Sequence, residues 1–268
     1  NNVKVLKIDN KGRDVSSLLV ACAPYVYNYD YVCFMHDKKT TQCKPYCTGE
    51  SFSYKCFENT LASKEFVENI ILTFENNPRL GMLMPPPPNH GTFYNIVGTE
   101  WASNYANTCS LGYKLGLHVN INWQKEPITP LGTMFWFRPE ALRTLFDFGW
   151  KYEDFPPEPN GFDGTLLHAV ERIYGFVVQH EGYYPAWLMS DKFARIEFTN
   201  LYFMLREING ILLQKHFTNN LLDMTEKMKN NMDFRWDNNM GKKWLVKKYM
   251  PKPMWNFCRK IYHGIKGQ

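Results

Sequence analysis

The sequence predicts an α/β fold, in which a mostly parallel, mixed sheet is flanked by helices and followed by a helical C-terminal extension. Short runs of β-branched and aromatic residues alternate with longer segments whose apolar residues recur at helical spacing, a pattern typical of α/β domains. The chain has 268 residues, of which 44% are hydrophobic and 21% charged, so it suits a folded domain and excludes general disorder.

The N-terminal part is predicted to contain a strand, a helix and a second strand. Residues 3–8 are apolar enough for a strand, and a polar turn follows them. Residues 15–26 have helical apolar spacing, with Asp14 as the expected N-cap. Residues 29–35 form a dense β-branched and aromatic run, so both predicted strands end in polar clusters.

The middle of the chain continues the alternation. The spacing predicts a helix over residues 51–77 and then a strand over residues 79–86, which four prolines bring to an end. Residues 89–115 carry no clear pattern. A strand over residues 132–137 leads into a helix over residues 139–149, whose first residue is a proline, as first helical turns favour.

The C-terminal part begins with a loop rich in proline and acidic residues. A helix is predicted over residues 165–175, then a strand and turn over residues 176–189, and further helices over residues 198–214 and 219–231. We therefore expect a main domain over residues 1–198 and a helical extension with a basic aromatic tail over residues 199–268.

The net charge of +5 belongs to the tail. Residues 241–268 contain eight Lys and Arg and no Asp or Glu, which leaves 23 cations against 26 acids in residues 1–240. Cations interleaved with Trp, Tyr and Phe suit an anionic membrane surface, although a solvated terminus or a docking segment for a neighbouring domain would look alike. No nucleic-acid-binding motif accompanies the charge, so no nucleic-acid partner is expected.

The same composition predicts a cytoplasmic location. No apolar stretch approaches the length of a membrane span, and the first ten residues do not resemble a signal peptide. Seven Cys is an odd number that favours reduced thiols. Peripheral contact with the inner face of the plasma membrane, through the tail, remains an open alternative.

Four segments stand out by their order and spacing: DNKGRDVSSLL, YDYVCFMHDKK, GTMFWFRPEALRTLFDFG and YEDFPPEPNGFDGTLLHAVERIYG. In these segments the chain resembles the rhamnan synthesis F (RgpF) family of bacterial glycosyltransferases, over about residues 3–190. The resemblance implies a GT-A type fold that lacks its first βαβ region. It also implies inverting transfer of rhamnose from dTDP-L-rhamnose to a lipid-linked cell-wall or capsular polysaccharide.

Polar residues that follow the first two strands are the candidates for donor binding, because ligands of such sheets bind at the carboxyl ends of strands. GT-A enzymes usually carry a DxD motif at the second of these positions, where it holds a divalent cation against the donor diphosphate. This chain has HDKK instead, so side-chain cations are expected to bind the diphosphate; a required cation, Mg²⁺ or Mn²⁺, is left open and no cofactor is certain. Solvated turns are the alternative interpretation. The donor-binding candidates are Asn10, Arg13, Asp14, His36, Asp37, Lys38 and Lys39.

An inverting transfer needs one carboxylate to take the proton of the acceptor hydroxyl. The resemblance places such a carboxylate just before the helix that contains LLHAVERIYG, which makes Asp163 the first candidate for the catalytic base. Asp163 is equally suited to be the N-cap of that helix. Glu158 is the second candidate, and Asp154 and Glu153 are further rivals.

Other residues carry weaker expectations. Thr133 and Trp136 are expected on the acceptor side, where an aromatic ring suits the apolar face of a sugar, although packing in a core strand is the alternative. A metal ion, if there is one, has His36, Asp37 and His180 as its possible ligands. His168 and Arg172 share a helix face and are interpreted as structural.

Two classes of function compete at this point. The first is an inverting glycosyltransferase, using dTDP-rhamnose or another nucleotide sugar. The second is a non-catalytic carbohydrate-binding or scaffolding module on a decayed GT-A fold, which the missing DxD motif favours.

Overall fold

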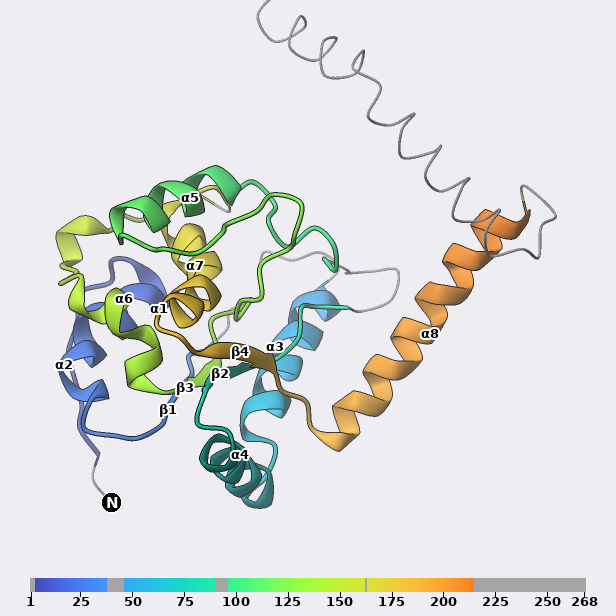
Figure 1. The fold of residues 1–268 in the computed structure, drawn as a ribbon, viewed down its shortest axis with the longest axis horizontal. Coiled ribbons are helices and arrows are strands. Elements are labelled where there is room, and N and C mark those ends of the chain that lie inside the picture. The colour runs from blue at the N-terminus through green and yellow to red at the C-terminus, as the bar shows by residue number, and fades with distance from the viewer. Residues whose placement is uncertain (1–2, 38–45, 90–95, 162, 215–268) are drawn as a thin grey trace, which may run out of the picture. The chain divides into compact units, whose positions relative to one another are not determined.

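The computed structural model describes residues 3–37, 46–89, 96–161 and 163–214 (Figure 1). The chain divides into two compact units, residues 1–203 and 204–268, and only residues 204–214 of the second are described. The predicted helix over residues 219–231 and the basic tail lie outside the described residues. The first unit contains the sheet and every contact discussed below.

The described residues form one mixed sheet of four strands in the order β1-β3-β2-β4. Strand β3 pairs antiparallel with both β1 and β2, and only β2 and β4 are parallel. The expectation of a mostly parallel sheet is therefore wrong, while the mixed α/β class is confirmed. A parallel β2–β3 pair would need a crossover packed on the sheet, but helix α5 of that connection packs on α7 instead. The strands are β1 (Val32–Phe34), β2 (Leu80–Met84), β3 (Phe135–Phe137) and β4 (Tyr184–Trp187).

The helices follow the sequence pattern with some differences in length. A continuous helical segment is made of α1 (Arg13–Ser16), a π-helical stretch (Ser17–Cys22) and α2 (Ala23–Val26). The others are α3 (Tyr46–Leu61), α4 (Lys64–Asn76), α5 (Tyr105–Lys114), the 3-10 turn Pro139–Leu142 with α6 (Arg143–Asp147), the 3-10 turn Tyr152–Asp154, α7 (Leu166–His180) and α8 (Asp191–Gln214).

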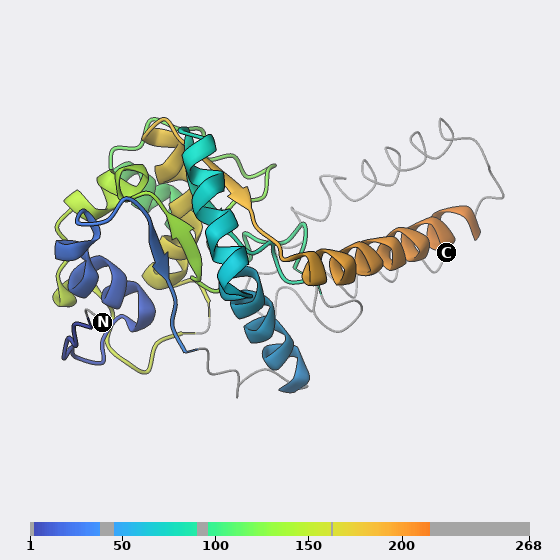
Figure 2. The same cartoon turned by 90° about the horizontal axis from the view of Figure 1, so that it is seen from below.

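Helices cover both faces of the sheet. Phe135 and Phe137 face the larger core, which α7, α5, α6 and the first helical segment complete. Trp136 points to the opposite face, where it packs with Ile70 and Phe74 of α4. Figure 2 shows the sheet from the side that α3 and α4 cover. Because successive residues of a strand point to opposite faces, this short strand contributes to both cores.

Three local predictions are wrong. Residues 3–8 form no strand, and Val3 and Val5 are more than 80% exposed, because no neighbouring strand in the described structure pairs with them. The helix predicted over residues 51–77 is two helices. The first, α3, ends at Leu61, and Ser63 caps α4 by accepting a hydrogen bond from the Phe66 N–H. The segment 176–180 continues α7 because its apolar residues complete the helix face buried in the larger core.

A buried ion pair links α3 to the start of α8. The Lys55 ammonium is fully buried; it donates to the Pro87 carbonyl at 2.6 Å and lies 3.4 Å from a Glu197 carboxylate oxygen. Asn89 donates to the other oxygen of the same carboxylate. Burial lowers the pKa of Lys55, and Glu197 opposes that shift. Among the described residues, Glu197 is therefore the carboxylate that compensates the charge of Lys55.

Replacing Glu197 with Gln should lower the free energy of unfolding by about 3 kcal/mol, because it leaves a buried cation without its partner. Glu68→Gln is the matched control, since it removes only the exposed Lys64–Glu68 pair on α4 and should cost little. Chemical denaturation of both variants measures the difference. Equal losses in the two variants would contradict the importance given to the buried pair.

Candidate functional site

A cavity of about 840 Å³ lies where β1, the turn before β3 and the first turn of α7 meet. Its volume is in the range of small-molecule sites. Seven of the predicted site residues line it, from four separate segments of the chain. They are Asn10, Arg13, Asp14, His36, Asp37, Thr133 and Glu158. Lys38 and Lys39 lie outside the described residues.

Gly132 connects its own turn to the segment after β1 and to α7. Its carbonyl lies 2.9 Å from Nε2 of His36, which follows β1, and its N–H donates to Oε1 of Glu171 on α7 at 2.6 Å. The turn needs a glycine, because Gly132 has a φ of 92°, a left-handed conformation that side chains disfavour. Thr133 also has a positive φ, of 55°. Backbone strain of this kind persists only where surrounding contacts enforce it, and it gathers at ligand sites.

The segment before the first helix forms a second such turn on the cavity lining. Gly12 has a φ of 79° and Arg13 a φ of 52°. A Cβ on Gly12 would lie 2.7 Å from Cγ of Phe155, so only glycine lets this turn approach the 152–161 loop. The N-cap of the first helix is therefore Gly12, not the predicted Asp14, whose side chain is left to face the cavity.

Arg13 and Glu158 form a two-point ion pair across the mouth of the cavity. Nε of Arg13 donates to Oε1 of Glu158 at 2.9 Å, and the second guanidinium nitrogen donates to Oε2 at 3.2 Å. The hydrogen bond from Arg13 is the main cause that lowers the pKa of Glu158. A carboxylate held in this way is a weak base, so Glu158 is better placed to orient Arg13 than to accept a proton.

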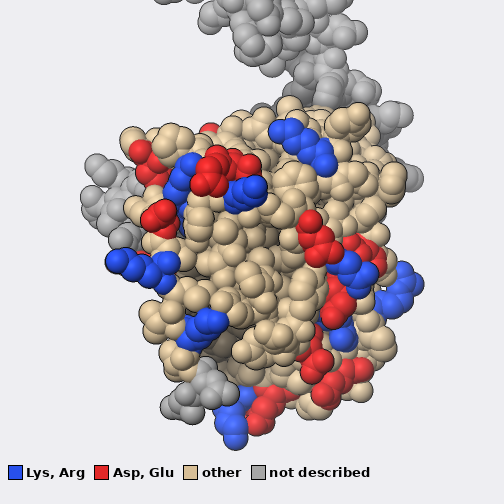
Figure 3. Space-filling view, turned by 90° about the vertical axis from the view of Figure 1, so that its left-hand side faces the viewer, with Lys and Arg blue, Asp and Glu red and all other residues tan. Residues whose placement is uncertain are grey.

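The cavity lining is mixed in charge. Five carboxylates and two fixed cations line it, but two of the carboxylates have cationic neighbours: Glu158 has Arg13 and Glu171 has Arg172, while Asp14 lies 3.9 Å from Nε2 of His36. The first turn of α7 also contributes, and a helix N-terminus favours anions. On the face in Figure 3 acidic and basic side chains are interspersed around the edge, so this face has no patch of a single charge that would attract an anion.

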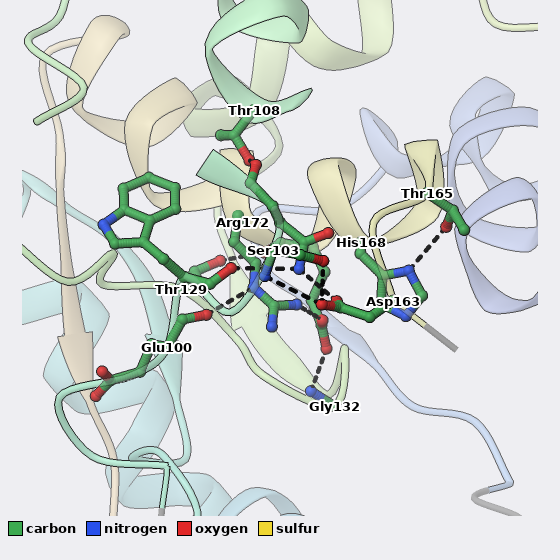
Figure 4. Close-up of polar contacts among 12 residues, drawn as sticks. Glu100, Ser103, Thr108, Thr129, Gly132, Asp163, Thr165, His168 and Arg172 are labelled. Atoms are coloured by element: carbon green, nitrogen blue, oxygen red, sulfur yellow. Dashed lines mark hydrogen bonds and ion pairs between the residues drawn. The ribbon is translucent and has the colours of Figure 1, made fainter. Parts of the chain in front are cut away.

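Asp163 lies beside the cavity and does not line it (Figure 4). The Ser103 N–H donates to its carboxylate at 3.1 Å, and the Ser103 hydroxyl and the Asn104 amide donate to it as well. Burial raises the pKa of Asp163, but these hydrogen bonds outweigh burial and lower the pKa to about 2. Its geometry is that of an anchor between the start of α5 and the loop before α7, which disfavours the predicted role as base.

The remaining predicted residues lie elsewhere. Trp136 is only 7% exposed, and its indole N–H donates to the Thr60 carbonyl in the smaller core, so the expectation of a sugar platform is wrong. His180 is at the far end of α7, where its Nδ1 accepts from the His118 N–H. Both ring nitrogens of His36 face carbonyl oxygens. Across the described ranges no group of three or more His, Cys, Asp or Glu is placed to bind a metal.

Lys11, Glu171 and His168 also line the cavity, which the sequence did not predict. Lys11 stands inside the NKGRD cluster and could have been included on that ground. His168 and Glu171 are three residues apart at the start of α7, so they share a face. Only the position of that helix start at the cavity distinguishes them from structural residues.

The fold is that of an α/β protein, and a cavity with a polar lining lies beside β1 and the turn before β3. The model of the rhamnan synthesis protein F family matches residues 1–183, and the chain belongs to that family. Membership associates the chain with the synthesis of polysaccharide.

Two curated relatives are similar to the chain. Both are described as uncharacterized protein WxcX, from Xanthomonas campestris pv. campestris strains B100 and ATCC 33913. Each is 29% identical over 176 residues, which is 65% of this chain and 24% of the relative. The chain thus spans about a quarter of the length of these relatives. No solved structure matches the chain.

No helix in the described ranges is both long enough and apolar enough to cross a membrane.

Asp163→Asn should lower the free energy of unfolding by about 1 kcal/mol, because the amide has a single acceptor oxygen and its NH₂ group would face one of the donors from Ser103 or Asn104, while partial solvation limits the loss. The pKa of Asp163 is lower in the folded than in the unfolded chain, so its contribution is complete above about pH 4 and is lost as pH falls toward about 2. Denaturation at several pH values should show the wild-type advantage shrinking over that interval. The exposed Asp30→Asn is the control, and an advantage independent of pH would contradict the anchor role.

Proposed function

We infer that this chain is a GT-A type glycosyltransferase domain, which moves a sugar from a nucleotide donor to a growing polysaccharide with inversion. The observation that carries this proposal is the cavity itself. Clusters separated by more than a hundred residues, each predicted to bind the donor or act in transfer, line one site of suitable size. The donor proposed from the family is dTDP-L-rhamnose, and the proposed acceptor is a lipid-linked cell-wall or capsular polysaccharide.

The donor diphosphate is assigned to the Arg13 side of the cavity. Arg13 presents a planar guanidinium that suits phosphate oxygens, and Lys11 and His36 lie on the same lining. The side-chain nitrogen of Asn160 is buried without a hydrogen-bond partner among the described residues, and Asn160 also lines the cavity. An unpartnered donor at this position favours a ligand rich in acceptor oxygens, such as a phosphate or a sugar.

A divalent cation bound with the diphosphate is a secondary part of this proposal. No described cluster could hold one unaided, so Mg²⁺ or Mn²⁺ would take most of its ligands from the diphosphate and water, with Asp37 as the adjacent carboxylate. Such an ion would stabilise the negative charge of the leaving group. Lys38 and Lys39, which follow Asp37 in the chain, carry charge of the same sign.

Inversion requires a single displacement and one base, so a second carboxylate close to the sugar is not needed. Thr133 lines the cavity and keeps its proposed place on the acceptor side. The basic tail over residues 241–268 is proposed to bring the domain to an anionic membrane surface at which a lipid-linked acceptor would be found. The competing function is a non-catalytic carbohydrate-binding or scaffolding module. Such a module would use the same cavity without transferring a sugar, so no nucleoside diphosphate would be released.

Nucleotide preference tests the proposed function. In a thermal-shift series with dTDP, UDP and GDP, dTDP should raise the unfolding midpoint most, because a ligand that binds only the folded state stabilises it. Slow release of dTDP from dTDP-rhamnose should accompany the shift. A clear preference for UDP or GDP would count against rhamnose as the sugar. Absence of both nucleotide binding and donor hydrolysis would favour the non-catalytic module.

Arg13→Gln should weaken dTDP binding by about 10-fold or more, since it removes a charge-assisted contact and leaves Glu158 facing the phosphates uncompensated. Arg143→Gln is the matched control, because it removes the same charge from exposed α6, away from the cavity. Isothermal titration measures both affinities. Equal dTDP affinities for the two variants would show that Arg13 does not bind the donor.

A further inference from the structure

We propose that His168, on the first turn of α7, is the general base that takes the proton of the acceptor hydroxyl in this cavity. The proposal rests on the glycosyltransferase function proposed above. It replaces the carboxylates near the start of α7 that the sequence favoured, and it assigns a catalytic role to a residue first interpreted as structural.

The position of the imidazole carries the argument. His168 lines the cavity, and Nδ1 lies 2.7 Å from the hydroxyl oxygen of Thr165, the residue that precedes α7 (Figure 4). No described residue forms a hydrogen bond with Nε2. If Nδ1–H donates to Thr165, the lone pair of Nε2 is free to accept a proton from a bound ligand. Thr165 is then a positioning residue that selects this tautomer, as the third member of a catalytic triad does.

Burial and the charges around His168 together keep its imidazole uncharged near neutral pH, which a base requires. Burial is the main cause that lowers its pKa; Arg172 and Arg13 lower the pKa as well, while Glu171 and Asp163 raise it. Asp14, His36 and Glu158 are further charged or titratable groups on the same cavity lining. An imidazole that is neutral at working pH accepts a proton more readily than a carboxylate whose pKa is lowered by hydrogen bonds.

Three of the rival carboxylates are engaged. Both oxygens of Glu171 accept hydrogen bonds, one from the Gly132 N–H and one from Arg172. Glu158 is held by Arg13, and Asp163 by Ser103 and Asn104. Asp9, Asp14 and Asp37 are the other carboxylates of the lining, and Asp14, which lies 3.9 Å from Nε2 of His36, is the rival tested below.

The step balances as follows. The acceptor oxygen forms a bond to the anomeric carbon of the donor as its proton moves to Nε2 of His168. The bond between the anomeric carbon and the phosphate oxygen breaks, and its electron pair leaves with the nucleoside diphosphate. The imidazolium then returns its proton to water. No oxidant or further reactant is involved.

The experiment compares the full chain with His168→Gln, His168→Ala and the control His180→Gln, which alters the same helix outside the cavity. Release of dTDP from dTDP-L-rhamnose, with water as acceptor, is followed against pH, and dTDP affinity and unfolding midpoints are measured in parallel. We expect His168→Gln to lose at least about 100-fold in rate with nearly unchanged dTDP affinity. The wild-type rate should fall on the acid side, at a pH below the ordinary imidazole range, as the imidazole protonates, and this limb should be absent in the variant. Added imidazole should restore rate to His168→Ala.

A second measurement does not depend on a variant's activity. Histidine ¹⁵N resonances of the wild-type chain should show His168 in the tautomer with the proton on Nδ1. The opposite tautomer, or a rate in His168→Gln equal to that of the control, would overturn the proposal. Loss of activity in Asp14→Asn with full activity in His168→Gln would move the role to Asp14. If the wild-type chain neither binds dTDP nor hydrolyses the donor, the glycosyltransferase function fails, and the role of His168 fails with it.

Discussion

The two hydrogen bonds of Gly132 are the constraint on which the site depends. One joins the end of β1 to the turn before β3 through His36, and the other joins that turn to α7 through Glu171. Neither segment is close to the turn in sequence, so the contacts exist only in the folded chain. They place the cavity beside the start of the central strand β3 and the first turn of α7. A side chain at Gly132 would disfavour the left-handed backbone conformation from which both contacts are made.

The same arrangement bears on how a domain with more acidic than basic residues could bind the proposed anionic ligand. Arg13 and Arg172 each lie against one of the cavity carboxylates, so part of the negative charge is compensated within the protein. Anion binding then depends on local groups: a guanidinium already oriented by Glu158, the start of α7, and amide donors such as Asn160. Long-range attraction from the body of the domain contributes little.

Much of the fold could be predicted from periodicity, because β1, β2, β3 and most helices carry strong patterns. Strand direction could not, because the residues of a strand do not show whether its neighbours run parallel or antiparallel to it. Polar residues after two predicted apolar strands were expected to meet at one site, and they line one cavity, although residues 3–8 form no strand and only β1 precedes such a cluster. Trp136 could not be assigned to a core or a cleft, because a three-residue strand between two cores has no exposed face. His168 was interpreted as structural, because a helix pattern does not show that the first turn of the helix borders a cavity.

A crystal structure of this chain soaked with dTDP would test the central claim most directly. Density for the diphosphate is predicted between Arg13 and His36, with the Arg13–Glu158 pair rearranged to contact phosphate and the open end of the cavity left beside His168. Density at another surface, or an empty cavity at saturating dTDP, would contradict the assignment of this cavity as the donor site.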